Sequence, residues 1–186
     1  MEAYIIDGYR SAVTKAKRGG FKNFRSDDLS VIVIKHLLNK FPEIELDRIN
    51  DVIVGCANPE GEQGLQVGRL ISARALGTRV PGMTINRYCA SGLEAISLAV
   101  SKINAGFGDI YVAGGAESMS RSPYILNTVR WGQKMGDAKT EDMMLGALNC
   151  PFGTGHMGIT AENVAKENNI TRSKQDEFAL ESQKRA

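Results

Sequence analysis

Short apolar runs alternate with segments of helical periodicity over the first 113 residues, and this alternation limits the fold more than any other feature of the chain. We predict strands at residues 3–9, 51–54, 83–88 and 109–113, with helices between them at 26–41, 67–77 and 91–103. Ser26 is expected to cap the first helix, and Pro42 to end it. Strands that alternate with helices form mostly parallel sheets with helices on both faces, so we predict an α/β fold.

The helix predicted at 91–103 is apolar on most of its sides, because charge is scarce between Glu94 and Lys102. A helix of this kind is buried on most sides. One sheet covers only one side, so we expect a further layer of protein to cover the other.

Residues 118–158 are too long and too irregular for an ordinary connection. This stretch holds five of the seven methionines: Met119, Met135, Met143, Met144 and Met157. Methionine adapts to variable shapes, so these residues either form a wall facing acyl groups or merely fill gaps in an irregular segment. Two helices are predicted to follow, at 160–168 and 172–186. We therefore divide the chain into an α/β core at 1–117, a loop region at 118–159 and a helical segment at 160–186.

The composition is that of an ordinary globular protein, with 42% hydrophobic residues, 24% charged residues and a formal net charge of +2. It gives no electrostatic reason to expect nucleic acid. Six basic residues without an intervening acid favour a solvated loop, although a patch near coenzyme phosphates is the alternative: Arg10, Lys15, Lys17, Arg18, Lys22 and Arg25.

The three cysteines, Cys56, Cys89 and Cys150, have no spacing typical of a metal site or a disulfide framework, so no metal is expected. They favour a reducing compartment, and we predict a cytoplasmic protein. No apolar run reaches the ~20 residues that a membrane helix needs, so no membrane partner is expected. The G-x-G-x-x-G run at 153–158 follows a loop and not a strand, so no dinucleotide cofactor is expected either.

Cys89 lies on a predicted turn between the strand at 83–88 and the helix at 91–103. The unpaired amides and the dipole of a helix N-terminus favour an anion, and therefore a thiolate. Small residues follow it, which leave room for a substrate: Ala90, Ser91 and Gly92. Although an arbitrary cysteine is most often a buried structural residue, this position favours a nucleophile. Its own backbone amide is a candidate donor to an oxyanion.

Several segments together resemble the thiolase family, and the resemblance extends along the whole chain. The segment around Cys89, Asn-Arg-x-Cys-x-Ser-Gly-Leu-x-Ala-Ile, resembles the nucleophile motif of thiolases. Other matches are Arg10 after the first predicted strand, Gly61-Glu62-Gln63-Gly64, Gly114-Gly115-Ala116-Glu117-Ser118-Met119-Ser120, and His156-Met157-Gly158-Ile159-Thr160-Ala161-Glu162-Asn163. One departure is Arg10-Ser11-Ala12-Val13-Thr14, where the family usually has Arg-Thr-Pro-x-Gly.

The resemblance implies a fold of five αβαβα layers, in which two similar sheet domains enclose central helices and only the first domain is present here. It also implies a loop domain that covers the substrate and helps to assemble a homodimer or homotetramer. Coenzyme A would be a substrate and not a cofactor. His156 and Met157 would lie along the pantetheine tunnel, and Cys89 would carry the acyl group during 3-ketoacyl-CoA cleavage, as in fatty acid β-oxidation, or during the reverse condensation.

Three further thiolase motifs are missing from the sequence: Gly-His-Pro, which holds the activating base, Cys-x-Gly, which holds an acid/base thiol, and Asn-Glu-Ala-Phe, which orients a water. All three belong to the second domain of the family. We therefore expect the first half of a thiolase, inactive by itself. A condensing enzyme like the ketoacyl synthases and a non-catalytic half that binds or assembles are the two alternatives.

Overall fold

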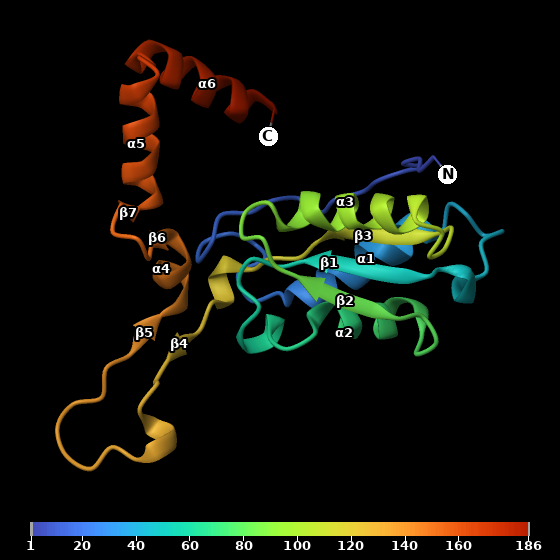
Figure 1. Ribbon diagram of the computed structural model, residues 1–186, viewed down its shortest axis with the longest axis horizontal. Helices are drawn as coiled ribbons and strands as arrows, with labels where there is room; N and C mark the ends of the chain where they lie inside the picture. Colours follow the sequence, from blue (N-terminus) through green and yellow to red (C-terminus); the bar gives the residue numbers. More distant parts are fainter. Residues whose placement is uncertain (1, 186) are drawn as a thin grey trace. The chain divides into compact units, whose positions relative to one another are not determined.

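The computed structural model describes residues 2–185, and the chain divides into two compact units at residues 1–144 and 145–186 (Figure 1). The first unit is built on a parallel sheet of three strands in the order β2-β1-β3. Its strands are β1 (Asp51–Gly55), β2 (Gly82–Ile85) and β3 (Tyr111–Gly115). Gly55 pairs with Ile85 on one side and with Gly115 on the other, so the three strands end at the same level.

Helices cover both faces of this sheet, as predicted. Helices α1 (Ser26–Leu38) and α2 (Val67–Leu76) lie on one face, and α3 (Ser91–Asn104) lies on the other (Figure 1). All five residues of β1 are buried. Val52 and Val54 pack with Ile71 of α2, whereas Ile53 packs with Ala95 of α3. Alternate residues of β1 thus face opposite layers, which explains why this strand is an uninterrupted apolar run.

The strand predicted at 3–9 does not form. Residues 3–9 pair with no strand, and Tyr4, Ile5 and Ile6 are more than 70% exposed. The segment and β3 both line a groove of about 930 Å³, so the edge of β3 beyond β1 is open. An apolar run forms a buried strand only where a neighbouring strand and a covering layer are both available.

The first helix also begins differently from the prediction. Arg25 is its N-cap, and Ser26 is its first helical residue and makes no capping hydrogen bond. Asp27 is fully buried in the first turn, where ion pairs to Arg25 and Arg74 satisfy its carboxylate at 2.9 and 2.6 Å. The start of α1 is therefore fixed by charge pairing with α2 and not by a serine cap.

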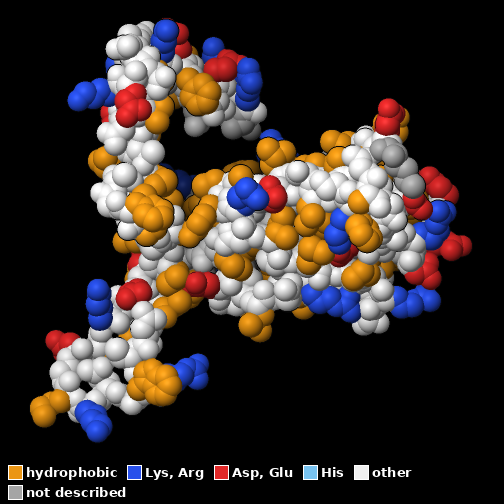
Figure 2. Space-filling view, viewed as in Figure 1, with side chains coloured by type: hydrophobic (Ala, Val, Ile, Leu, Met, Phe, Trp, Pro, Cys, Tyr) orange, Lys and Arg blue, Asp and Glu red, His pale blue; other side chains and the backbone are white. Residues whose placement is uncertain are grey.

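The outer side of α3 has no cover within residues 2–144. Leu93 is 71% exposed and Ile96 is 36% exposed, whereas Ala95 and Ala99 on the inner side are buried against the sheet. Figure 2 shows hydrophobic side chains exposed across this unit. One sheet therefore covers one side of α3, as its composition predicted.

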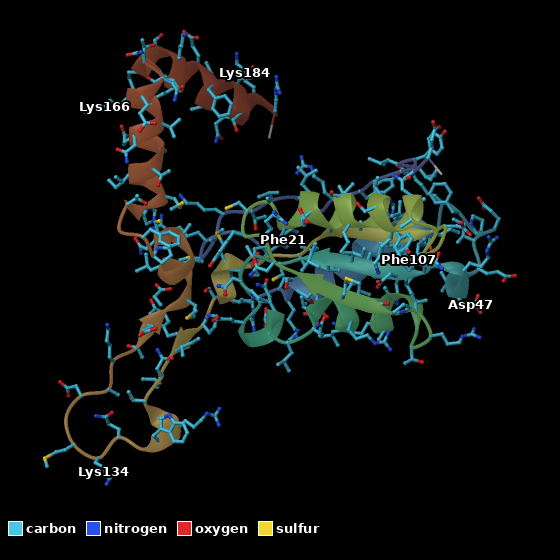
Figure 3. All side chains as sticks on the ribbon, viewed as in Figure 1. Phe21, Asp47, Phe107, Lys134, Lys166 and Lys184 are labelled. Carbon is cyan, nitrogen blue, oxygen red and sulfur yellow. The ribbon has the colours of Figure 1, made fainter. Side chains whose placement is uncertain are left out.

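After β3 the chain becomes irregular. Strands β4 (Tyr124–Ile125) and β5 (Glu141–Asp142) form a short antiparallel pair, and Figure 3 shows Lys134 in the long loop between them. The single-turn helices of the first unit are η1 (Leu46–Arg48), η2 (Gly61–Gln63), η3 (Met119–Arg121) and η4 (Val129–Trp131). Helix α4 (Met143–Leu148) spans the boundary between the units.

The second unit contains an antiparallel pair, β6 (Asn149–Cys150) and β7 (Gly155–His156), followed by α5 (Met157–Glu167) and α6 (Arg172–Arg185). Helix α6 confirms the prediction over its described residues. Helix α5 begins three residues earlier than predicted, because the His156 ring caps it by accepting a hydrogen bond from the Gly158 amide at 3.0 Å. None of the described helices is both long and apolar enough to cross a membrane.

Candidate active site

Cys89 lies on an exposed turn between the end of β2 and the start of α3, which confirms the predicted order of strand, turn and helix, although β2 ends at Ile85 and not at Tyr88. The preceding residue, Tyr88, has a φ of 47°, which is uncommon for a bulky side chain. The left-handed backbone conformation of Tyr88 lets the chain reverse its direction within a few residues. The thiol is thereby presented beside the first turn of the helix, beyond the carboxyl end of the sheet, where open α/β sheets bind ligands.

Two side chains hold this turn. Asn86 Oδ1 accepts a hydrogen bond from the Tyr88 amide at 2.7 Å. Ser91 Oγ accepts one from the Arg87 amide at 2.8 Å and donates one to the Tyr88 carbonyl at 2.5 Å. The backbone adds bonds from Ala90 to Arg87 and from Ser91 to Tyr88. The Cys89 amide donates none of these bonds, so it is a suitable donor to an anionic oxygen.

The start of α3 packs directly on the end of β1. A Cβ atom at Gly55 would lie 2.3 Å from the backbone carbonyl of Ser91, far closer than atoms approach each other in proteins. Only glycine at this position allows the helix, and the turn before it, to lie so close to the sheet.

We therefore expect Gly55→Ala to lower the melting temperature by about 5 °C or more, because overpacked backbone costs ~1–3 kcal/mol. The matched control is Gly92→Ala, at a position where a Cβ meets no atom within 4 Å. Alanine favours helix, so the control is expected to melt at the same temperature or slightly above. Thermal unfolding followed by circular dichroism measures both, and equal melting temperatures would contradict the packing argument.

No base is bonded to Cys89 within its own unit. Over residues 2–144, no hydrogen bond joins the Cys89 thiol to a histidine or a carboxylate. The charged neighbours on the helix, Arg87 and Glu94, pair with each other at 3.0 Å. A thiol acts best as a nucleophile with a base beside it. The geometry thus presents an exposed thiol beside one available amide donor, and no base is bonded to the thiol within residues 2–144.

The two other thiols lie in different surroundings. Cys56 is buried at the end of β1, where burial, and then the nearby Glu117 carboxylate, raise its pKa to about 12. It is therefore protonated and inert at neutral pH. Cys150 is half-buried on β6, and a hydrogen bond with the Thr154 side chain lowers its pKa. Cys150 therefore has enhanced thiolate character, but no helix begins beside it.

A second polar cluster adjoins the Cys89 turn and escaped the sequence analysis. The Gln63 side chain is buried and donates to Glu117 Oε1 at 2.7 Å. Glu117 Oε2 accepts from the Ala57 amide at 2.7 Å. Gln63 and Glu117 both lie in motifs that resemble thiolases, and that was the only signal in the sequence for this cluster. It lies where β1 and β3 end, beside the end of β2.

The structure places His156 and Met157 at the start of α5 in the second unit, and Cys89 in the first. The Nδ1 atom of His156 accepts the capping hydrogen bond, so a neutral ring has its proton on Nε2. Their role in substrate binding stays a prediction. Of the basic residues near the N-terminus, Arg25 is engaged by Asp27 and Glu62. Residues 2–185 contain no group of three or more potential metal ligands of the His, Cys, Asp and Glu types.

Comparison with known proteins agrees with this geometry. The family described as "Thiolase, N-terminal domain" matches residues 3–186. The chain belongs to the thiolase family. It is 41% identical over its whole length to beta-ketothiolase BktB of Cupriavidus necator, and 42% identical to a 3-ketoacyl-CoA thiolase of Bacillus subtilis. A crystal structure of the Bacillus anthracis acetyl-CoA acetyltransferase superposes with a TM-score of 0.79 over 87% of this chain, at 36% identity.

This thiolase sequence spans about half the length of its curated relatives, because it covers 47% of the Cupriavidus protein and 44% of the Bacillus subtilis protein. It covers 41% of the chain in the crystal structure. The matched region is the N-terminal thiolase domain, which confirms the predicted family and fold class. The predicted boundaries at 117/118 and 159/160 stay predictions, while the structure divides after residue 144.

Proposed function

We propose that this chain is the nucleophile-bearing half of an acetyl-CoA acyltransferase that cleaves 3-ketoacyl-CoA. The supporting observation is the Cys89 turn: an exposed thiol at the start of α3, beside a backbone amide that is available to an oxyanion. Membership of the thiolase family supports the same assignment. Coenzyme A enters as a substrate, and the proposal requires no cofactor.

In the proposed reaction, the Cys89 thiolate attacks the 3-keto carbon of the substrate, and the carbonyl oxygen becomes an alkoxide that accepts a hydrogen bond. The bond between C2 and C3 then breaks as the carbonyl re-forms. The electron pair remains on C2, which takes a proton and leaves as acetyl-CoA. The acyl group on Cys89 passes to the thiol of a second coenzyme A, and the Cys89 thiolate is regenerated. The reverse sequence is a Claisen condensation.

The steps that move protons need groups that Cys89 lacks in this chain. The thiolase resemblance assigns the base and the acid to the second domain, which would also cover the exposed side of α3. We propose that the reaction runs as cleavage, as in fatty acid β-oxidation, or as the reverse condensation. We also propose a cytoplasmic location, because all three cysteines are free thiols.

The proposed function is tested in a chimera in which these 186 residues replace the matching part of the Bacillus subtilis thiolase. We expect it to consume acetoacetyl-CoA and coenzyme A and to form acetyl-CoA. Decarboxylation of a malonyl thioester, without this cleavage, would favour the ketoacyl synthase alternative. A folded chimera that binds coenzyme A without either reaction would favour the non-catalytic alternative.

We further propose that the chain forms a homodimer or homotetramer. The open edge of β3 is a surface that monomeric proteins rarely expose, and in the 186-residue chain without its second domain the apolar side of α3 is exposed as well. Light scattering of the purified 186-residue chain is expected to give the mass of two or more copies at micromolar concentration. A homogeneous monomer would count against this assembly.

His156 and Met157 are proposed to bind the pantetheine portion of the substrate. Because such contacts stabilise the ground state and the transition state equally, His156→Ala and Met157→Ala in the chimera are expected to raise KM about tenfold and leave kcat nearly unchanged. Steady-state kinetics with acetoacetyl-CoA measures both constants. A large fall in kcat at constant KM would instead give His156 a role in the chemistry.

A further inference from the structure

We propose that Asn86 is a positioning residue for Cys89, and that it acts through a hydrogen-bonded brace across the ends of all three parallel strands. The inference rests on the proposed function only in taking Cys89 as the nucleophile. It concerns how the thiol is held, and it adds a residue that touches neither the thiol nor the substrate.

Both ends of the Asn86 side chain are engaged. Its Oδ1 atom accepts from the Tyr88 amide at 2.7 Å, and its Nδ2 atom donates to the Ala57 carbonyl at 3.2 Å. The first bond fixes the residue before Cys89, and the second reaches the segment that follows β1. Asn86 thus links the nucleophile turn to the neighbouring strand end.

The backbone of Ala57 is also bound by a residue that follows β3. The Ala57 amide donates a hydrogen bond to Glu117 Oε2 at 2.7 Å. Glu117 Oε1 accepts from the buried Gln63 side chain at 2.7 Å, and Gln63 Oε1 accepts from the Ser118 amide at 2.5 Å. Because Gly55 aligns with both Ile85 and Gly115, the three segments that follow these residues lie close enough to be bridged by side chains.

The brace stabilises the backbone conformation of Tyr88. A bulky residue with a φ of 47° adopts a sparsely populated conformation, which persists only where its surroundings hold it. Asn86 forms the local turn that stabilises this conformation. Without this turn, Tyr88 is free to relax, and Cys89 loses its fixed place at the start of α3.

The test measures alkylation of each cysteine by iodoacetamide in the 186-residue chain, with peptide mass spectrometry, from about pH 6 to pH 10. Asn86→Ala is expected to slow the reaction of Cys89 about tenfold at neutral pH, the effect of losing one or two hydrogen bonds. The Cys150 rate is expected to stay unchanged.

Two variants make the comparison specific. Asn58→Ala removes the side chain next to Ala57 in the sequence, which donates to Ser122 Oγ at 2.6 Å and not to the Cys89 turn. This variant is expected to leave the Cys89 rate unchanged. Asn86→Ser keeps an uncharged acceptor that is able to form the same kind of turn, so its Cys89 rate is expected to lie between those of Asn86→Ala and the unsubstituted chain.

Buried Cys56 reports whether each variant remains folded, because it reacts only when the core opens. The proposal is overturned if Cys89 in Asn86→Ala is alkylated at the same rate as in the unsubstituted chain while Cys56 stays protected. If Asn86→Ala exposes Cys56, the Cys89 rate of Asn86→Ser is compared with that of Asn58→Ala. A slower rate in Asn86→Ser supports the brace, and an equal rate in the two variants overturns it. Alkylation needs no coenzyme A, so an inactive chimera would leave this test intact.

Discussion

The 186-residue chain by itself is expected to leave acetoacetyl-CoA uncleaved, whereas the chimera with a second thiolase half cleaves it. The reason is chemical: cleavage needs a base for Cys89 and an acid for the departing carbanion, and the thiolase resemblance assigns both to the second domain. General acid–base groups contribute ~10²–10⁴-fold each, so the chain alone is expected to be at least about 10⁴-fold slower than the chimera.

The measurement is the loss of acetoacetyl-CoA in the presence of coenzyme A, at equal concentrations of the chain and the chimera. The control is the 186-residue chain with Cys89→Ala, which sets the background. Turnover by the unsubstituted chain that disappears in this control would contradict the prediction. It would show that the chain provides its own acid/base group, and His156 would be the first candidate.

Replacement of the nucleophile is expected to have the second large effect. In the chimera, Cys89→Ala is expected to lower kcat by about 10⁴-fold or more, because no other group is able to accept the acyl chain. Binding of the substrate is expected to persist, since alanine is smaller than cysteine and leaves the turn intact. Steady-state and single-turnover kinetics measure these quantities.

The matched control for that experiment is Cys150→Ala. Cys150 has a pKa lowered by its hydrogen bond with Thr154, so a reaction governed by thiolate character alone would depend on it. The activity of the Cys150→Ala chimera is expected to stay within about twofold of that of the unsubstituted chimera. A loss of activity in Cys150→Ala together with an active Cys89→Ala would reverse the assignment.

Much of the fold could be predicted from the sequence where one local pattern decides the structure. Helices α3 and α6 and the buried run of β1 appear where they were expected, whereas the strand before Cys89 ends at Ile85 and not at Tyr88. The prediction failed at residues 3–9, because their burial depends on a strand partner and a covering layer. It also failed at Ser26, because the buried ion pairs of Asp27 with Arg25 and Arg74 fix the start of α1.

The candidate site was predicted in part for the same reason. Cys89 was found from its neighbours along the chain, whereas the contacts of Asn86 with Ala57, and of Ala57 with Glu117, depend on the register of three parallel strands. A hydrophobic pattern excludes a shift in register by one residue, because that shift would expose the buried face, but a shift by two residues keeps the same face buried. The need for glycine at position 55 could not be predicted either, because a Cβ atom there would clash with the backbone of Ser91, which is distant in the sequence.

The most direct test of the central claim is to identify the residue that becomes acylated. The chimera is incubated with acetyl-CoA, quenched in acid and digested, and each cysteine-containing peptide is examined by mass spectrometry. We predict one acetyl group on the peptide that contains Cys89. This acetyl group is expected to be lost when free coenzyme A is added before the quench. An acetyl group on Cys56 or Cys150 instead, or turnover without any acetylated cysteine, would contradict it.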